Sequence, residues 1–159
     1  MSDKLDKLYK ELITIENFDL AWFRLKTTRQ NIYYKNYYRK LYSSYDINKT
    51  TKINNLKSLS DRLKNNIYSP SPPTVVYIPK SNGLHRPFSF LCLEDLIVYQ
   101  GISNIVEELF RKRREEVEHN ITFGNMLSSS DSRYFFKKWE DNYQEYKEKI
   151  SEYYKKGNI

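Results

Sequence analysis

Two basic side chains flank a short polar turn near the middle of the 159-residue chain. Lys80 precedes the turn at residues 81–83, and Arg86 follows it. Phosphate groups are bound by cationic donors held a short distance apart, and arginine adds planar two-point hydrogen bonding to the compact charge of lysine. Lys80 and Arg86 could therefore bind one phosphate group together. The alternative is that both are solvated charges of an exposed turn, and spacing alone does not separate the two.

The charge balance favours a polyanionic partner. Lys and Arg number 27 against 20 Asp and Glu, giving a formal net charge of +7, which attracts nucleic acid or an anionic membrane surface. Heavy use of Lys, Asn, Tyr and Ile would also follow from an AT-rich coding sequence. Tyrosines alternate with cations over residues 33–40, so Lys35, Arg39 and Lys40 form a candidate nucleic-acid surface with bases stacked on the rings. The alternative places about half of these rings in the core.

Cys92 is the single cysteine of the chain, which excludes an internal disulfide and a cysteine-rich zinc site. We expect it to pack as a small apolar residue. The sequence contains no long continuous apolar run, so we expect neither a signal peptide nor a transmembrane helix. The predicted location is cytoplasmic, without a membrane partner.

A β-hairpin is predicted to hold Lys80 and Arg86. Residues 74–78, TVVYI, are β-branched and aromatic and are bounded by prolines, which favours a strand. Gly83 is the natural residue for a positive φ in the turn. Residues 87–91 form a second strand at a sheet edge, because Pro87 cannot donate a backbone hydrogen bond.

Helices are predicted on both sides of this hairpin. Apolar spacing indicates helices over residues 5–12, over residues 20–45 after an N-cap at Asp19, and over residues 56–67. Proline ends the third at the YSPSPPT stretch. The fold class is therefore α+β and mostly α, with one central hairpin.

Two more helices are predicted after the hairpin. The first covers residues 93–117, where Glu94 and Asp95 complement the helix dipole, and its RKRREE run should form internal ion pairs. His119 lies beyond this run, and the sequence shows no constellation of residues around it. The last covers residues 132–156 and carries a seam predicted to be buried, with steps of three and four residues: Phe136, Trp139, Tyr143, Tyr146, Ile150 and Tyr153.

Residues 75–110 resemble the fingers region of reverse transcriptases of the bacterial retroelement kind. The resemblance lies in a Pro-Lys pair, a glycine-containing turn, an Arg-Pro pair, and an acidic-led helix with an aspartate and a glutamine five residues later. These positions are Pro79, Lys80, Gly83, Arg86, Pro87, Asp95 and Gln100. The amino-acid sequence of the helix is similar to that of the defence-associated, abortive-infection branch of these enzymes.

The resemblance implies the first part of a right-hand polymerase. Residues 1–70 would be a helical N-terminal extension, residues 71–127 the fingers-like hairpin and helix, and residues 128–159 a helical segment leading to an absent palm. In such enzymes the palm aspartates hold two Mg²⁺ ions. We therefore expect no catalytic or metal-binding residue before Ile159 and no polymerisation by this chain alone, with Mg²⁺ expected only for the complete enzyme.

The resemblance also implies roles and partners. Lys80 and Arg86 would contact the triphosphate of an incoming deoxynucleotide or the template backbone, and the other positions would support the fingers and the template: Gly83, Pro87, Asp95 and Gln100. The expected partners are an RNA or DNA template-primer, a deoxynucleotide, and the missing palm and thumb. Intron-type members carry a Phe-Arg-Pro-Gly run after the long helix, of which this chain keeps only Phe123 and Gly124.

Two alternatives stay open. The chain could be a stand-alone basic helical module that binds nucleic acid or regulates another protein, without polymerase descent. The fingers interpretation needs Lys80 and Arg86 on one face of a hairpin packed against the helix that begins near Glu94, and the module does not. The aromatic seam of the last helix could also mediate self-association.

Overall fold

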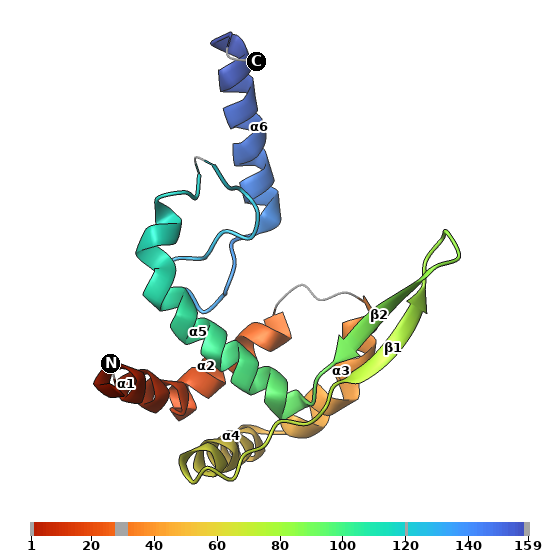
Figure 1. Ribbon diagram of the computed structural model, residues 1–159, viewed down its shortest axis with the longest axis vertical. Coiled ribbons are helices and arrows are strands. Elements are labelled where there is room, and N and C mark those ends of the chain that lie inside the picture. Colours follow the sequence, from red (N-terminus) through yellow and green to blue (C-terminus); the bar gives the residue numbers. More distant parts are fainter. Residues whose placement is uncertain (1, 28–31, 120, 158–159) are drawn as a thin grey trace. The chain divides into compact units, whose positions relative to one another are not determined.

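The computed structural model describes residues 2–27, 32–119 and 121–157. Within these ranges it is a mostly helical α+β structure with one two-stranded antiparallel sheet (Figure 1), which confirms the predicted fold class. The chain divides into two compact units, residues 1–103 and 104–159, and the division falls inside the long helix α5. The elements in order are α1 (Ser2–Leu12), α2 (Ile15–Thr27), α3 (Ile32–Tyr45), α4 (Lys49–Lys64), β1 (Thr74–Pro79), β2 (His85–Phe90), α5 (Leu93–Glu115) and α6 (Trp139–Lys155).

The first unit is built around one apolar core. Helices α2, α3 and α4, the end of β2 and the start of α5 contribute to it, and its most buried members are Phe18, Ala21, Trp22, Tyr38, Leu56, Leu59, Phe90 and Ile97. Polar contacts lie at the edge of this core: the Trp22 Nε1–H donates to Asp46 Oδ2 at 2.9 Å, and Lys26 pairs with the same oxygen at 2.8 Å. This core is the support on which the hairpin rests.

The helix boundaries of the first unit differ from those predicted. Helix α2 begins at Ile15 because Thr14 caps it, with the Asn17 N–H donating to Thr14 Oγ1 at 3.2 Å. The predicted N-cap at Asp19 is wrong: Asp19 lies inside α2 and pairs with Lys52 at 2.6 Å. The single helix predicted over residues 20–45 is α2 and α3, with residues 28–31 between them outside the described ranges.

Helix α4 also begins earlier than predicted. The Asn48 side chain caps it by accepting from the Thr51 N–H at 2.9 Å. The helix ends at Lys64, so Ile67 lies beyond it and is exposed. Asparagine is among the preferred N-cap residues because its side-chain oxygen satisfies an unpaired helical N–H.

Gly101 allows α5 to approach α2 closely within the first unit. A Cβ atom at this position would lie 3.2 Å from the Phe18 ring, 3.2 Å from the Asn17 amide and 3.3 Å from Leu12. The Asn17 amide also donates to the carbonyl groups of Leu12 and Gly101, at 2.9 and 3.3 Å. The glycine therefore serves packing, and it costs α5 about 1 kcal/mol of helix propensity.

We predict that Gly101→Ala lowers the free energy of unfolding by about 1 kcal/mol. Alanine regains helix propensity, but the added methyl overpacks a site where Phe18 is fully buried and cannot give way, which typically costs about 1–3 kcal/mol. Urea unfolding measures the difference. Gly124→Ala is the control, because a Cβ at Gly124 meets nothing within 4 Å. A stabilised Gly101→Ala protein would contradict this packing argument.

The second unit has little buried apolar surface among its described residues. Its buried hydrophobic side chains are Met126 and Leu127. Helix α6 begins at Trp139 rather than near residue 132, and its predicted seam is not buried: Trp139 is 55% and Ile150 39% exposed. Phe136, the first residue of the predicted seam, precedes the helix, and the buried residue of α6 is Asn142, which is not part of the seam. No spacing rule states whether another part of the chain covers an apolar face. None of the helices in the described ranges is long and apolar enough to span a membrane.

Candidate nucleic-acid interface

The register of the hairpin places Lys80 and Arg86 on one face. Ile78 lies opposite Arg86 in the antiparallel ladder, so these two side chains point to the same side of the sheet. Lys80 follows Ile78 by two residues, and its N–H donates to the Leu84 carbonyl at 2.7 Å, which extends the pairing by one step. Because side chains alternate along a strand, Lys80 shares the face of Arg86 at the turn end of the hairpin.

A short turn fixes the separation of the two cations. Gly83 has φ +80°, as predicted, and its N–H donates to the Lys80 carbonyl at 3.1 Å. The Asn82 side chain accepts from the Leu84 N–H at 3.2 Å. This pattern is typical of a three-residue hairpin loop that needs a left-handed residue at its third position. Pro87 lies opposite Tyr77, on the other face of the sheet from Arg86.

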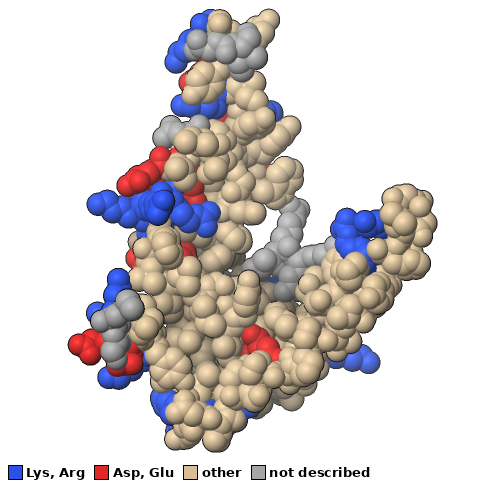
Figure 2. Space-filling model, in the orientation of Figure 1, with Lys and Arg blue, Asp and Glu red and all other residues tan. Residues whose placement is uncertain are grey.

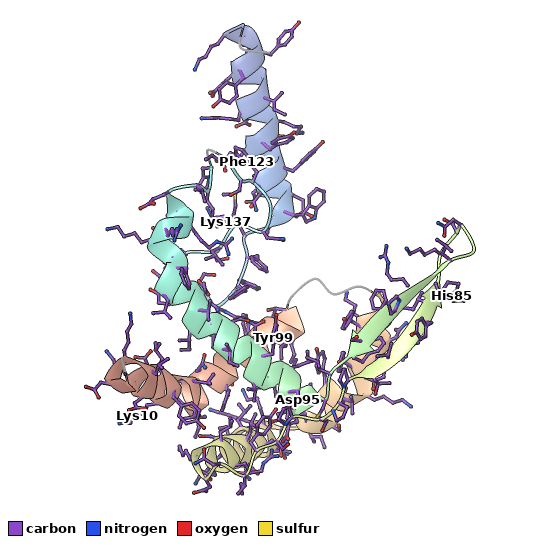
Figure 3. The ribbon with its side chains drawn as sticks, viewed as in Figure 1. Lys10, His85, Asp95, Tyr99, Phe123 and Lys137 are labelled. Atoms are coloured by element: carbon purple, nitrogen blue, oxygen red, sulfur yellow. The ribbon has the colours of Figure 1, made fainter. Side chains whose placement is uncertain are left out.

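Both cations are open to a ligand. Lys80 and Arg86 are exposed, and within the described ranges neither side chain forms an ion pair or a hydrogen bond. Figure 2 shows basic side chains gathered beside the turn of the hairpin, and His85 lies on the same hairpin in Figure 3. An exposed lysine and arginine without internal partners can neutralise phosphate charge without first breaking a contact.

Helix α3 supports the hairpin through aromatic rings. The Tyr34 hydroxyl donates to the Ser89 carbonyl at 3.1 Å, and the Tyr38 hydroxyl donates to the Leu91 carbonyl at 2.7 Å. The Tyr37 ring stacks on Phe90 with centroids 4.3 Å apart. The rings that contact the hairpin thus belong to α3, whereas the fingers interpretation expected the hairpin to pack against the helix that begins near Glu94, which is α5. Phe90 also belongs to the core cluster to which the start of α5 contributes.

The cations of α3 do not share one face. Lys35 and Arg39 are one turn apart and lie along one side of the helix, whereas Lys40 is rotated by about 100° from Arg39. All three are exposed. Tyr38 is fully buried and Tyr34 is partly buried, so these rings belong to the packing; the side chain of Tyr33 lies outside the described set. The predicted surface is therefore a row of two cations with a third on another side.

The excess positive charge is concentrated in two sequence segments, one of which contains the hairpin. Residues 20–45 and 62–93 contain ten of the 27 Lys and Arg residues and none of the 20 Asp and Glu residues, so the rest of the chain has 17 basic and 20 acidic residues. Several of the ten are paired, as Lys26 is with Asp46. Among the described cations of these segments, those whose side chains make no ion pair, hydrogen bond or ring contact with another described residue are Lys35, Arg39, Lys40, Lys80 and Arg86.

Asp95 holds the segment that leads into β1. It is buried at the start of α5 (Figure 3), where its Oδ1 accepts from the Tyr68 hydroxyl and its Oδ2 accepts from the Ser71 N–H at 3.0 Å. Burial raises the pKa of Tyr68, and the hydrogen bond to Asp95 raises it further. Gln100 is partly buried and lies about 140° from Asp95 around the helix. The structure therefore does not bring these two predicted residues together, and their support of a template stays a prediction.

The acidic first turn of α5 also binds α4. Glu94 pairs with Arg62 of α4 at 2.5 Å. Glu94 and Asp95 together therefore join α4 and the loop that follows it to α5, the helix that belongs to the fingers-like segment. Cys92, next to this turn, is exposed rather than packed. The expected packing of Cys92 is therefore wrong. The residue lies beyond Phe90, the last residue of β2 that pairs with β1, where side chains no longer alternate between the two faces of the sheet.

The second unit contains a set of side-chain contacts that no sequence pattern indicated. His119 Nδ1 contacts Glu145, and Lys137 Nζ lies 3.0 Å from His119 Nε2, so His119 has two contacts that the sequence did not indicate. These residues lie 18 and 26 positions from the histidine, beyond any helix or strand spacing. The RKRREE run does form ion pairs, but the described pairs join Arg111 to Glu107 and Glu108 and Arg114 to Glu118, whose acidic partners lie outside the run, rather than joining members of the run to one another.

Comparison with known proteins gives one partial match. Protein YkfC of Escherichia coli (strain K12) is 36% identical over 69 residues, which is 43% of this chain and 17% of YkfC. The chain thus spans about a sixth of the length of that relative. No family model and no solved structure matches the chain.

Proposed function

We propose that this chain is a fingers-type nucleic-acid-binding segment of a reverse transcriptase-like protein, and that it acts within a larger unit. The observation that carries the proposal is the shared face of Lys80 and Arg86 beside an exposed glycine turn. The resemblance of residues 75–110 to bacterial retroelement enzymes supplies the function that this geometry would serve. The partners proposed are a single-stranded template and the triphosphate of a deoxynucleotide.

The chemistry follows from the two side chains. The Arg86 guanidinium can hold two oxygens of one phosphate, and the Lys80 ammonium can neutralise a second oxygen or the next phosphate. The nearest acidic residues in sequence are Asp61 and Glu94, and Glu94 is already paired with Arg62. A polyanion at the turn therefore meets little repulsion, and counterion release strengthens its binding at low salt.

The proposal places the metal ions of the resembled enzymes in their palm and assigns none to this chain. No group of three or more His, Cys, Asp or Glu side chains in the described ranges is placed to hold a metal ion. The proposal therefore assigns this chain binding and positioning of phosphate groups, and assigns the metal-dependent addition of nucleotides to residues outside these ranges.

A stand-alone binding module is the second candidate. The exposed row of Lys35 and Arg39 on α3 favours it, because that row could bind a strand without the hairpin. The two candidates differ in which cations dominate. The fingers segment depends most on Lys80 and Arg86, and the module depends most on Lys35 and Arg39.

We predict that Lys80→Ala combined with Arg86→Ala weakens binding of a 20-nucleotide single-stranded RNA by about tenfold at moderate salt, because two phosphate contacts are lost. Fluorescence anisotropy measures the affinity, and a deoxynucleoside triphosphate should compete with the RNA for the wild-type protein. The control removes two exposed cations elsewhere, with Lys155→Ala and Lys156→Ala, and should change affinity less than threefold. A larger effect from Lys35→Ala with Arg39→Ala would favour the module instead.

A further inference from the structure

The outer edge of β1 carries backbone groups that β2 does not bind. The Lys80 N–H donates to the Leu84 carbonyl across the ladder, and the hydrogen-bonded positions of an antiparallel pair recur at every second residue. Counting back from Lys80 in steps of two gives the residues of β1 that bond to β2. Val75 and Tyr77 lie between these positions, so their N–H and C=O groups point away from β2.

Side chains leave this edge open. Val75 is 48% and Tyr77 65% exposed, and neither side chain makes a hydrogen bond, ion pair or ring contact with another described residue. All residues from 69 to 77 are exposed, and the turn end of the hairpin projects beyond the helices of the first unit (Figure 1). A strand edge is usually protected by charge, proline or a bulge, and residues 74–78, TVVYI, contain neither charge nor proline.

The opposite edge of the sheet, along β2, is closed. Pro87 lies opposite Tyr77, at an outward position of the ladder, and proline has no N–H to offer to a further strand. Two residues later, the Ser89 carbonyl already accepts from the Tyr34 hydroxyl at 3.1 Å. A further strand can therefore bind β1 but not β2, so growth of the sheet stops after one added partner.

We propose that β1 pairs with β1 of a second copy of this chain, antiparallel and with Val76 on the two-fold axis, to form a four-stranded sheet. In this register Val75 of each copy lies opposite Tyr77 of the other, and the two pairs exchange four backbone hydrogen bonds. Each pair also sets a tyrosine ring against a β-branched side chain, which stabilises a sheet. Pro73 of each copy meets Pro79 of the other, and because neither has an N–H, the ladder ends there.

The distribution of charge favours a second copy over a charged partner strand. Residues 73–79 carry no charge, so a strand with charged side chains would find no opposite charge along β1. In the symmetric register, Lys80 of each copy lies opposite Pro72 of the other, and the two lysines lie at opposite ends of the paired strands. The strand is thus its own complement in backbone groups, apolar pairs and charge. The inference does not depend on the proposed function.

Sedimentation equilibrium of the full chain tests the pairing. The wild-type protein should show a reversible dimer with a Kd on the order of 100 µM, because one strand pair is smaller than a standard interface. Val76→Lys should weaken the dimer about tenfold, because two like charges meet at the axis, and Val76→Glu should do the same. Ser89→Lys adds the same charge at an exposed position of β2 that faces no residue of the second copy, and it should stay within about twofold of wild type.

An equal mixture of Val76→Lys and Val76→Glu separates repulsion at the axis from loss of the fold. Opposite charges then face each other, so the mixture should recover dimerisation to within about threefold of wild type, which two misfolded variants could not do. A strict monomer at about 500 µM would overturn the proposal. So would a dimer that is insensitive to Val76→Lys, or a mixture that stays as weak as its components.

Disulfide cross-linking checks the register. Residues that face each other at a non-hydrogen-bonded position have Cα atoms about 4.5 Å apart, which a disulfide can span. With the exposed Cys92 replaced by serine, Val76→Cys should form a covalent dimer under mild oxidation much faster than Ser89→Cys. Equal rates for the two variants would contradict the pairing of β1 about Val76.

Discussion

Replacing Tyr38 with alanine should lower the free energy of unfolding by about 3–5 kcal/mol, the usual loss for a large aromatic side chain removed from a core. Tyr38 is fully buried, and its ring lies 5.8 Å from Tyr42 and 6.1 Å from Phe90. Its hydroxyl also donates to the Leu91 carbonyl, which directly follows β2. The substitution removes both the packing and the bond that fasten the hairpin to α3.

Tyr38→Phe is the matched control for that result. It keeps the ring and removes only the hydroxyl, so the Leu91 carbonyl loses a partner and the expected loss is about 1–2 kcal/mol. Chemical denaturation compares the three proteins, and hydrogen exchange of the β1 and β2 amides reports whether the hairpin loosens before the helices. A loss below about 1 kcal/mol for Tyr38→Ala would show that the hairpin does not depend on α3.

Asp95→Ala should lower the free energy of unfolding by about 2–3 kcal/mol. The carboxylate accepts from the Tyr68 hydroxyl and the Ser71 N–H, and hydrogen bonds to a charged group contribute about 1.5–3 kcal/mol. The segment from Tyr68 to β1 would lose its attachment to α5. Thermal or urea unfolding of the variant measures the loss directly.

Asp95→Asn separates the structural role of Asp95 from a role in binding. The amide oxygen can still accept from the Ser71 N–H, and the amide nitrogen can donate to the Tyr68 hydroxyl oxygen, so the expected loss is only about 1 kcal/mol. Because Asp95 is buried and both its oxygens are engaged, the affinity for single-stranded RNA should not change. A folded Asp95→Asn protein with much weaker binding would show that Asp95 contacts the nucleic acid.

The hairpin could be predicted from the sequence because its signals are local. Prolines, β-branched residues and Gly83 lie within a few positions of one another, and they determine both the strands and the turn. The register then follows from the length of the turn, so the common face of Lys80 and Arg86 was within reach of sequence reasoning. The ends of the strands were less certain because proline at Pro79 and Pro87 did not stop the ladder.

Other features depend on contacts between distant residues. The aromatic contacts of α3 with Phe90 join residues more than 50 positions apart, and no periodicity indicates which helix covers a hairpin. The partners of Asp95 lie 24 and 27 positions away and those of His119 lie 18 and 26 positions away, also beyond the reach of local spacing. Helix α6 is a different case: Trp139, Tyr143, Tyr146, Ile150 and Tyr153 keep the predicted spacing, but the helix begins later than predicted and the seam is not buried. Periodicity identifies an apolar face, whereas burial depends on what packs against it.

The salt dependence of single-stranded RNA binding tests the central claim most directly. Each phosphate contact contributes about −0.7 to the slope of log affinity against log salt concentration for a single strand. Removing Lys80 and Arg86 together should therefore reduce the magnitude of the slope by about 1.4, while the Lys155→Ala and Lys156→Ala control keeps the wild-type slope. Parallel lines for the wild-type protein and the hairpin variant would contradict the account, because they would mean that neither hairpin cation touches a phosphate.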